Sequence, residues 1–164
     1  MARQFFLALA VSSAALGLAG CGDSASAPEP APSWSDPDAP AGISVSEGRM
    51  TLPAVAGNPG AVYFTIRNGG DSDEMLRAAW VSGAGTAQLH QSTREGTTAR
   101  MREVSEVTVP AGGTVSFAPG GLHVMAFDIS DRLEIGSETE VTLTFASGDK
   151  VSFPVQVRAA GDAG

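Results

Sequence analysis

The chain has 164 residues and a formal net charge of −8, from 10 lysines and arginines against 18 carboxylates. This length fits one domain with short flanking segments. No basic cluster appears along the chain, so a phosphate backbone would be repelled and no nucleic acid partner is expected. The single cysteine, Cys21, excludes an internal disulfide and a cysteine-rich metal site.

Residues 1–20 are predicted to be a secretory signal peptide. A positively charged start is followed by an apolar run over residues 5–18, which is too short to cross a bilayer comfortably. The run ends in Leu18-Ala19-Gly20-Cys21, which resembles the bacterial lipobox, whose cysteine becomes the acylated first residue of the mature protein. We therefore expect a periplasmic protein that Cys21 anchors to the membrane by its acyl chains. Whether this is the inner or the outer membrane remains open.

Residues 21–42 are predicted to form the lipidated cysteine and a disordered, Pro- and Ala-rich tether. This segment has almost no aliphatic bulk, so folding would not offset the entropy of ordering it. Trp34 is its one large apolar residue, which we expect to be an exposed aromatic; docking of Trp34 on the domain is the alternative that the sequence leaves open. The tail at residues 159–164 is also expected to be disordered.

Residues 43–158 are predicted to form the folded domain, as short β-type runs between turns rich in glycine and proline. No segment has helical periodicity over ten or more residues. Seven to nine strands at this spacing predict an all-β, antiparallel sandwich or barrel. The expected strands are residues 61–67, 75–82, 87–92, 104–109, 114–118, 122–128, 141–145 and 151–157.

The candidate functional residues are two histidines and two methionines. His90 is followed after ten residues by Met101, then after twenty-one residues by His123, and Met125 comes one residue later. Strand alternation places His123 and Met125 on one face and Val124 on the other. Taken singly, a methionine is usually core filler and a histidine a hydrogen-bonded surface residue, so the inference depends on the set.

A hairpin is expected to bring His90 and Met101 together. If Glu95-Gly96 forms its tip, a symmetric loop places His90 directly across from Met101. Cross-strand partners have Cβ atoms about 4.5–5.5 Å apart, close enough to bind one ion. Leu89 is then expected to point into the core, so that His90 points away from it.

Two imidazoles and two thioethers predict a site for one Cu(I) ion. A thioether is a soft, neutral ligand that suits Cu(I) and does little for zinc, magnesium or calcium. Blue copper is excluded because it needs a thiolate beside two imidazoles. No enzyme activity is predicted, since no nucleophilic cysteine or Ser-His-Asp arrangement is visible and both histidines are assigned to the metal.

The chain resembles the periplasmic copper chaperones of the PCu(A)C type. His90, Met101, His123 and Met125 match the His and Met spacing of that family without a gap, and the run Pro119-Gly120-Gly121-Leu122-His123-Val124-Met125 is the most specific match. Two further runs, which begin at Tyr63 and at Val109, also resemble sequences of that family. The resemblance spans about residues 43–157. It departs at Gln91, where members often have a methionine, and in the tail, which lacks the second copper site of some members.

The resemblance implies a cupredoxin-like β-sandwich that binds one Cu(I) through those four residues. It also implies a monomer that hands copper to an acceptor such as a cytochrome c oxidase subunit or a thioredoxin-like copper assembly protein. Two other readings remain open on the sequence alone. One is copper buffering or tolerance at the cell envelope, and the other is a metal-free β-sandwich lipoprotein that binds protein or glycan.

Overall fold

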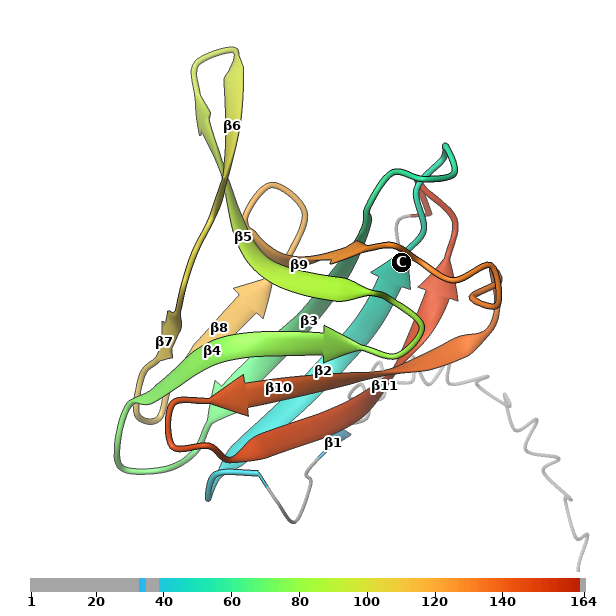
Figure 1. Ribbon diagram of the computed structural model, residues 1–164. Helices are drawn as coiled ribbons and strands as arrows, with labels where there is room; N and C mark the ends of the chain where they lie inside the picture. Colours follow the sequence, from blue (N-terminus) through green and yellow to red (C-terminus); the bar gives the residue numbers. More distant parts are fainter. Residues whose placement is uncertain (1–32, 35–38, 163–164) are drawn as a thin grey trace, which may run out of the picture. The chain divides into compact units, whose positions relative to one another are not determined.

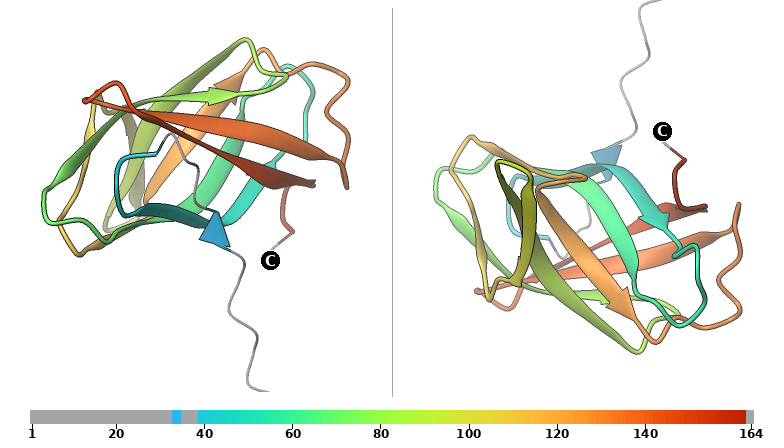
Figure 2. Two further views of the ribbon diagram at one scale, coloured as in Figure 1. Left: turned by 90° about the horizontal axis from the view of Figure 1, so that it is seen from below. Right: turned by 90° about the horizontal axis from the view of Figure 1, so that it is seen from above.

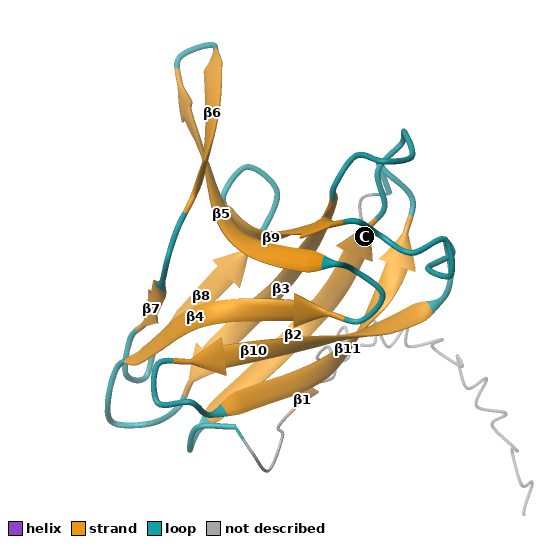
Figure 3. Cartoon of the chain, viewed as in Figure 1, coloured by secondary structure: helices purple, strands orange, loops and turns teal. Residues whose placement is uncertain are grey.

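The computed structural model describes residues 33–34 and 39–162. The predicted signal peptide, Cys21, most of the predicted tether and the last two residues of the tail lie outside this part. Figures 1 and 3 show that the described chain is built from strands and loops, without a helix. Accordingly, it has no helix long and apolar enough to cross a membrane. The strands are β1 Ser33–Trp34, β2 Ile43–Thr51, β3 Gly60–Asn68, β4 Glu74–Val81, β5 Thr86–Glu95, β6 Thr98–Glu103, β7 Val107–Val109, β8 Thr114–Phe117, β9 Leu122–Phe127, β10 Glu138–Phe145 and β11 Lys150–Arg158.

The strands form one sheet in the order β6-β5-β9-β8-β3-β2-β11-β10-β4-β7, with β1 paired to β2. Figure 2 shows this sheet curled on itself, so that its two halves face each other. The all-β, cupredoxin-like prediction is confirmed. Its strand count was too low, because the described chain has eleven strands. The pairing is also mixed, since β11 runs parallel to β2 and β8 parallel to β9.

The core is a single cluster of side chains from one face of each long strand. In β10, for example, Val141, Leu143 and Phe145 are buried while the residues between them are not. Phe64 stacks on Phe117 with ring centroids 4.4 Å apart. Burying each such side chain contributes about 1.5–3 kcal/mol, which is enough to hold the sheet closed without disulfides. The opposite face of β10 carries Glu138, Glu140, Thr142 and Thr144, which are exposed or half-buried.

Two strands, β2 and β6, have patterns that sequence alternation does not reveal. In β2, Glu47 has a φ of 59° and the register with β3 shifts between Ser46 and Arg49. This bulge interrupts the period of two. In β6, all six residues are exposed, so no alternation exists to be read.

The segment Ser33–Trp34 pairs with β2 through its backbone, with Ser33 opposite Ser46 and Trp34 opposite Val45. This short part of the predicted tether is therefore attached to the sheet. A few residues later, Ala39 packs against the core just before β2 begins.

Candidate metal centre

The four predicted ligands lie on three neighbouring strands, β6, β5 and β9. His90 is on β5 and is directly opposite His123 on β9. Leu89 and Val124, which come next to them in sequence, are opposite each other and buried in the core. The two imidazoles therefore lie on the outer face of the sheet, as alternation predicts.

The predicted register of the β5–β6 hairpin is wrong by two residues. Met101 lies opposite Ser92, and His90 lies opposite Glu103. The cause is the turn: Glu95 pairs with Thr98, and Gly96 has a φ of 61°, so a two-residue loop follows Glu95. Met101 still shares the face of His90, one diagonal step towards the tip. Diagonal neighbours lie about 7–8 Å apart, within reach of a long side chain.

The rings of His90 and His123 have centroids 6.0 Å apart and planes at 49°. With metal–nitrogen bonds of about 2.0 Å, each ring centroid would lie roughly 3.2 Å from an ion, so rings up to about 6.4 Å apart can share one ion. The observed separation meets this condition. On the other side of His123 lies the ring of Tyr63, at a centroid distance of 6.3 Å.

His123 is buried and has one ring nitrogen fixed by the backbone. Its Nδ1 lies 3.0 Å from the carbonyl oxygen of Gly121, and the residue is only 4% exposed. A carbonyl can only accept, so Nδ1 carries the proton of the neutral ring and Nε2 bears the lone pair. Such a backbone hydrogen bond is the usual way in which a protein orients an imidazole ligand.

His90 presents the opposite nitrogen. Its Nε2 lies 3.3 Å from Oε1 of Gln88, to which it donates. Its Nδ1 is buried and has no hydrogen-bond partner. A buried lone pair without a partner costs about 1–3 kcal/mol, and a bound cation would remove that cost. Burial, followed by the nearby His123, lowers the pKa of His90 below 6.5, while Glu103 raises it. The lowered pKa favours the neutral ring at pH 7, which is the form that a metal ligand needs.

The two methionines differ in exposure. Met125 is half-buried and lies opposite Gln88 on β5 and Ala61 on β3. Met101 is 55% exposed on the edge strand β6. Both thioethers are on the same face of the sheet as the two imidazoles. The structure thus brings the histidines into direct proximity and places one methionine on each side of them.

Sequence reasoning missed the residues that orient the histidines. Gln88 lies two positions before His90, and Gly121 two positions before His123. The i, i+2 spacing puts Gln88 on the face of His90, which is a signal that could have identified it. Tyr63, on β3, was also missed. The guanidinium carbon of Arg49 lies over its ring, 5.0 Å from the centroid, and no local sequence pattern indicates this contact.

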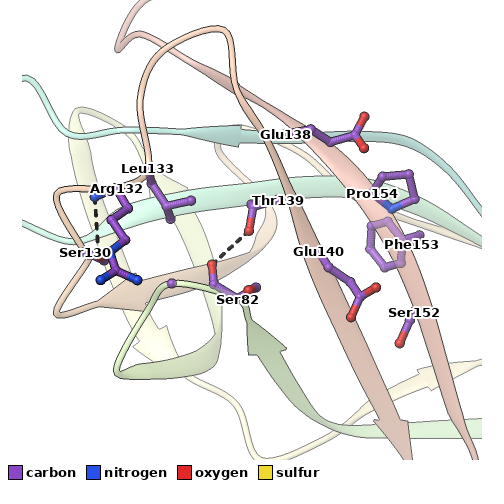
Figure 4. A pocket seen from close by; sticks show the side chains of 11 residues that line it. Ser82, Ser130, Arg132, Leu133, Glu138, Thr139, Glu140, Ser152, Phe153 and Pro154 are labelled. Atoms are coloured by element: carbon purple, nitrogen blue, oxygen red, sulfur yellow. Dashed lines mark hydrogen bonds between the residues drawn. The ribbon is translucent and has the colours of Figure 1, made fainter.

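Other parts of the described molecule fit a metal less well. Nowhere in residues 39–162 do three His, Cys, Asp or Glu side chains gather so that they could hold an ion. A cleft of about 860 Å³ lies between the loop at Ser130 and strands β10 and β11. Figure 4 shows its lining, where Thr139 donates to the carbonyl oxygen of Ser82. Neither histidine nor methionine lines this cleft.

Comparison with known proteins assigns the family. The sequence model of the family described as "Putative lipoprotein LpqE-like" matches residues 43–157, well over half of the chain. The "Putative lipoprotein Lxx21020" of Leifsonia xyli subsp. xyli (strain CTCB07) is 30% identical over 153 residues, which cover 92% of this chain and 88% of that protein.

Solved structures share the fold. The apo PCuAC domain from PmoF1 superimposes with a TM-score of 0.61 at 27% identity, over 72% of this chain and 94% of that one. The copper-bound PCuAC domain from PmoF2 gives 0.59 at 22% identity, over 72% and 93%. The solution structure of CuI-DR1885 from Deinococcus radiodurans gives 0.55 at 28%, over 70% and 78%. The chain therefore belongs to the LpqE-like lipoprotein family, and its predicted resemblance to the PCu(A)C copper chaperones is confirmed.

Proposed function

We propose that this chain is an extracytoplasmic copper chaperone that carries one Cu(I) ion on His90, Met101, His123 and Met125. The observation that carries this proposal is the pair of imidazoles on one sheet face, with ring centroids 6.0 Å apart and the buried Nδ1 of His90 lacking a partner. Both methionines lie on the same face.

The donor set selects the reduced ion. Thioethers are soft and neutral, and they suit Cu(I) better than they suit hard divalent cations. Four neutral ligands leave the ion with its single positive charge, whose partial burial costs less than that of a divalent ion. Cu(II) would favour additional nitrogen or oxygen donors, so redox cycling is not part of the proposed role.

Related structures support copper as the cargo. Two of the solved domains with this fold are described by their names as copper-bound and as CuI-bound. The second of them is 28% identical to this chain. That identity supports a shared ligand chemistry.

Delivery is favoured over storage by the exposure of Met101. A ligand that is 55% exposed on an edge strand can leave the ion without disturbing the core. An incoming thiolate or imidazole would then replace the donors one at a time, starting with Met101. A storage site would gain from burying all four ligands, whereas here only His123 is fully buried.

The proposal includes a membrane anchor and a copper acceptor. Acylated Cys21 would hold the chain at the inner or outer membrane, facing the periplasm. We propose a monomer that passes copper towards cytochrome c oxidase assembly, to an oxidase subunit or a thioredoxin-like copper assembly protein.

Anaerobic Cu(I) titration against a colorimetric chelator tests the binding step. We expect one equivalent to bind, and expect His123→Ala with Met125→Ala to abolish this binding. Met75→Ala is the matched control, because Met75 is on β4 and is not one of the four proposed ligands. If the chain takes up no copper, or if the double variant binds like the wild type, the proposal fails.

Deletion of the gene separates delivery from buffering. Delivery predicts a loss of cytochrome c oxidase activity in copper-poor medium, restored by wild-type chain but not by His123→Ala. Buffering predicts poor growth in copper-rich medium with normal oxidase activity, and that result would contradict delivery.

A further inference from the structure

The β5–β6 hairpin projects beyond the body of the sheet, as Figure 1 shows at the upper left of the molecule. We call residues 92–102 the arm. It begins where the backbone N–H of Ser92 donates to the carbonyl oxygen of Gly121, the last described anchor of β5 outside the hairpin. Beyond it, residues 93–102 are all exposed. β6 is the terminal strand of the sheet and pairs with β5 alone.

The arm is positively charged on an acidic protein. It carries Arg94, Arg100 and Arg102 against one carboxylate, Glu95. The other residues between 39 and 162 carry six cations against thirteen carboxylates. Within the described chain, the one ion pair joins Arg77 to Glu106, so no carboxylate neutralises the arm's guanidiniums within 4.0 Å. Arg102 donates to Gln91, whereas Arg94 and Arg100 extend into solvent.

The arm also carries the most exposed proposed ligand. Met101 lies between Arg100 and Arg102 in sequence, and Ser92, its cross-strand partner, is two residues from Arg94. Arg94 is on the face of Met101, whereas Arg100 and Arg102 project from the opposite face of the arm. A group attracted to the arm would therefore arrive within a few residues of the thioether that is freest to leave copper.

We propose that the arm is the docking surface for the copper-exchange partner, and that this partner is a protein with an acidic contact surface. This inference rests on the proposed function. A protein is favoured over a lipid surface for two reasons. The free edge of β6 offers backbone donors and acceptors that an extended protein segment can pair with. Exchange at Met101 needs an incoming soft donor, and lipid headgroups provide none.

The transfer step is a ligand exchange without a change of oxidation state. The acceptor's thiol loses its proton to solvent as its thiolate forms a bond to copper, and the bond between copper and Met101 breaks. The arm's charges act before this step, by raising the rate of productive encounter through electrostatic attraction.

The test uses the full chain with Cys21→Ser, loaded with Cu(I), and two synthetic dithiol peptides flanked by glutamates or by lysines. Stopped-flow transfer to the glutamate peptide should be about tenfold faster at low salt, and the preference should vanish at high salt. Arg94→Gln with Arg100→Gln should remove the preference. Arg132→Gln with Lys150→Gln changes the net charge equally at exposed sites outside the arm and should keep it.

Several outcomes would overturn the proposal. One is equal slowing in both double variants, which would indicate net charge alone, and another is no slowing in the arm variant. Charge-insensitive transfer, together with arm-dependent binding to phosphatidylglycerol vesicles but not to phosphatidylcholine vesicles, would assign the arm to a membrane. Equilibrium Cu(I) binding is measured first: if it is absent, the proposed function fails, whereas normal binding with charge-insensitive transfer refutes the docking arm only.

Discussion

The Nδ1 atom of His123 and the carbonyl oxygen of Gly121 are 3.0 Å apart, and the same oxygen accepts the backbone N–H of Ser92 at 2.9 Å. One loop carbonyl thus fixes the orientation of a buried imidazole and the point where the arm leaves the sheet. Rotation of the His123 ring would break its hydrogen bond to the carbonyl oxygen that also anchors the arm.

The two histidines should adopt opposite tautomers in the metal-free chain. Long-range ¹H–¹⁵N NMR spectra should show the Nδ1–H form for His123 and the Nε2–H form for His90, because each protonated nitrogen donates to an oxygen. Addition of Cu(I) should then shift Nε2 of His123 and Nδ1 of His90. Copper shifts on the other two nitrogens would contradict the assignment.

Gln88→Ala should weaken Cu(I) binding by about tenfold, because it removes the acceptor that orients His90. The measurement is chelator competition under anaerobic conditions. Gln91→Ala is the matched control: Gln91 contacts Arg102 instead of His90 and lies on the opposite face of β5. Equal effects of the two substitutions would contradict an orienting role for Gln88.

Met101→Ala and Met50→Ala should have opposite consequences. Met101 is 55% exposed, so its truncation should change the free energy of unfolding by less than about 0.5 kcal/mol while weakening Cu(I) binding. Met50 is fully buried in the core, so its truncation should cost about 2–5 kcal/mol. Urea unfolding and copper titration of both variants measure the contrast. A stable Met101→Ala chain with unchanged affinity would remove Met101 from the ligand set.

An NMR pH titration of the metal-free chain should place the pKa of His90 below 6.5. Burial is the larger cause and the neighbouring His123 the smaller one, while Glu103 opposes them. The unfolded chain then binds more protons at His90 than the folded chain does. The free energy of unfolding should therefore fall as the pH drops from 6.5 towards the lower pKa of the folded chain. Glu103→Gln should lower the pKa further. A pKa at or above 6.5 would show that the ring is not desolvated.

Alternation in the sequence predicted the faces of the site correctly, because the side-chain period of a strand is fixed. Leu89 and Val124 are buried, and His90 and His123 lie on the other face. It did not predict which residues lie opposite each other. That depends on the turn at Gly96, which moved Met101 two positions away from the expected partner.

The sequence did not predict three other features of the structure, which are the β5–β9 pairing, the arm and the strand β2. No local pattern indicates that β5 pairs with β9, yet this pairing brings His90 next to His123. The basic arm was missed for a local reason. Its three arginines are separated in sequence, and only the projecting β5–β6 hairpin, in which Arg100 lies opposite Thr93, gathers them on one exposed ribbon. The strand β2 was missed because its bulge at Glu47 breaks the alternation.

X-ray absorption at the copper edge of the anaerobically loaded chain tests the central claim most directly. The account predicts one Cu(I) bound by two nitrogen and two sulfur atoms, with the sulfur contribution lost in Met101→Ala with Met125→Ala. A shell of nitrogen and oxygen alone, or sulfur scattering that survives in this double variant, would contradict it.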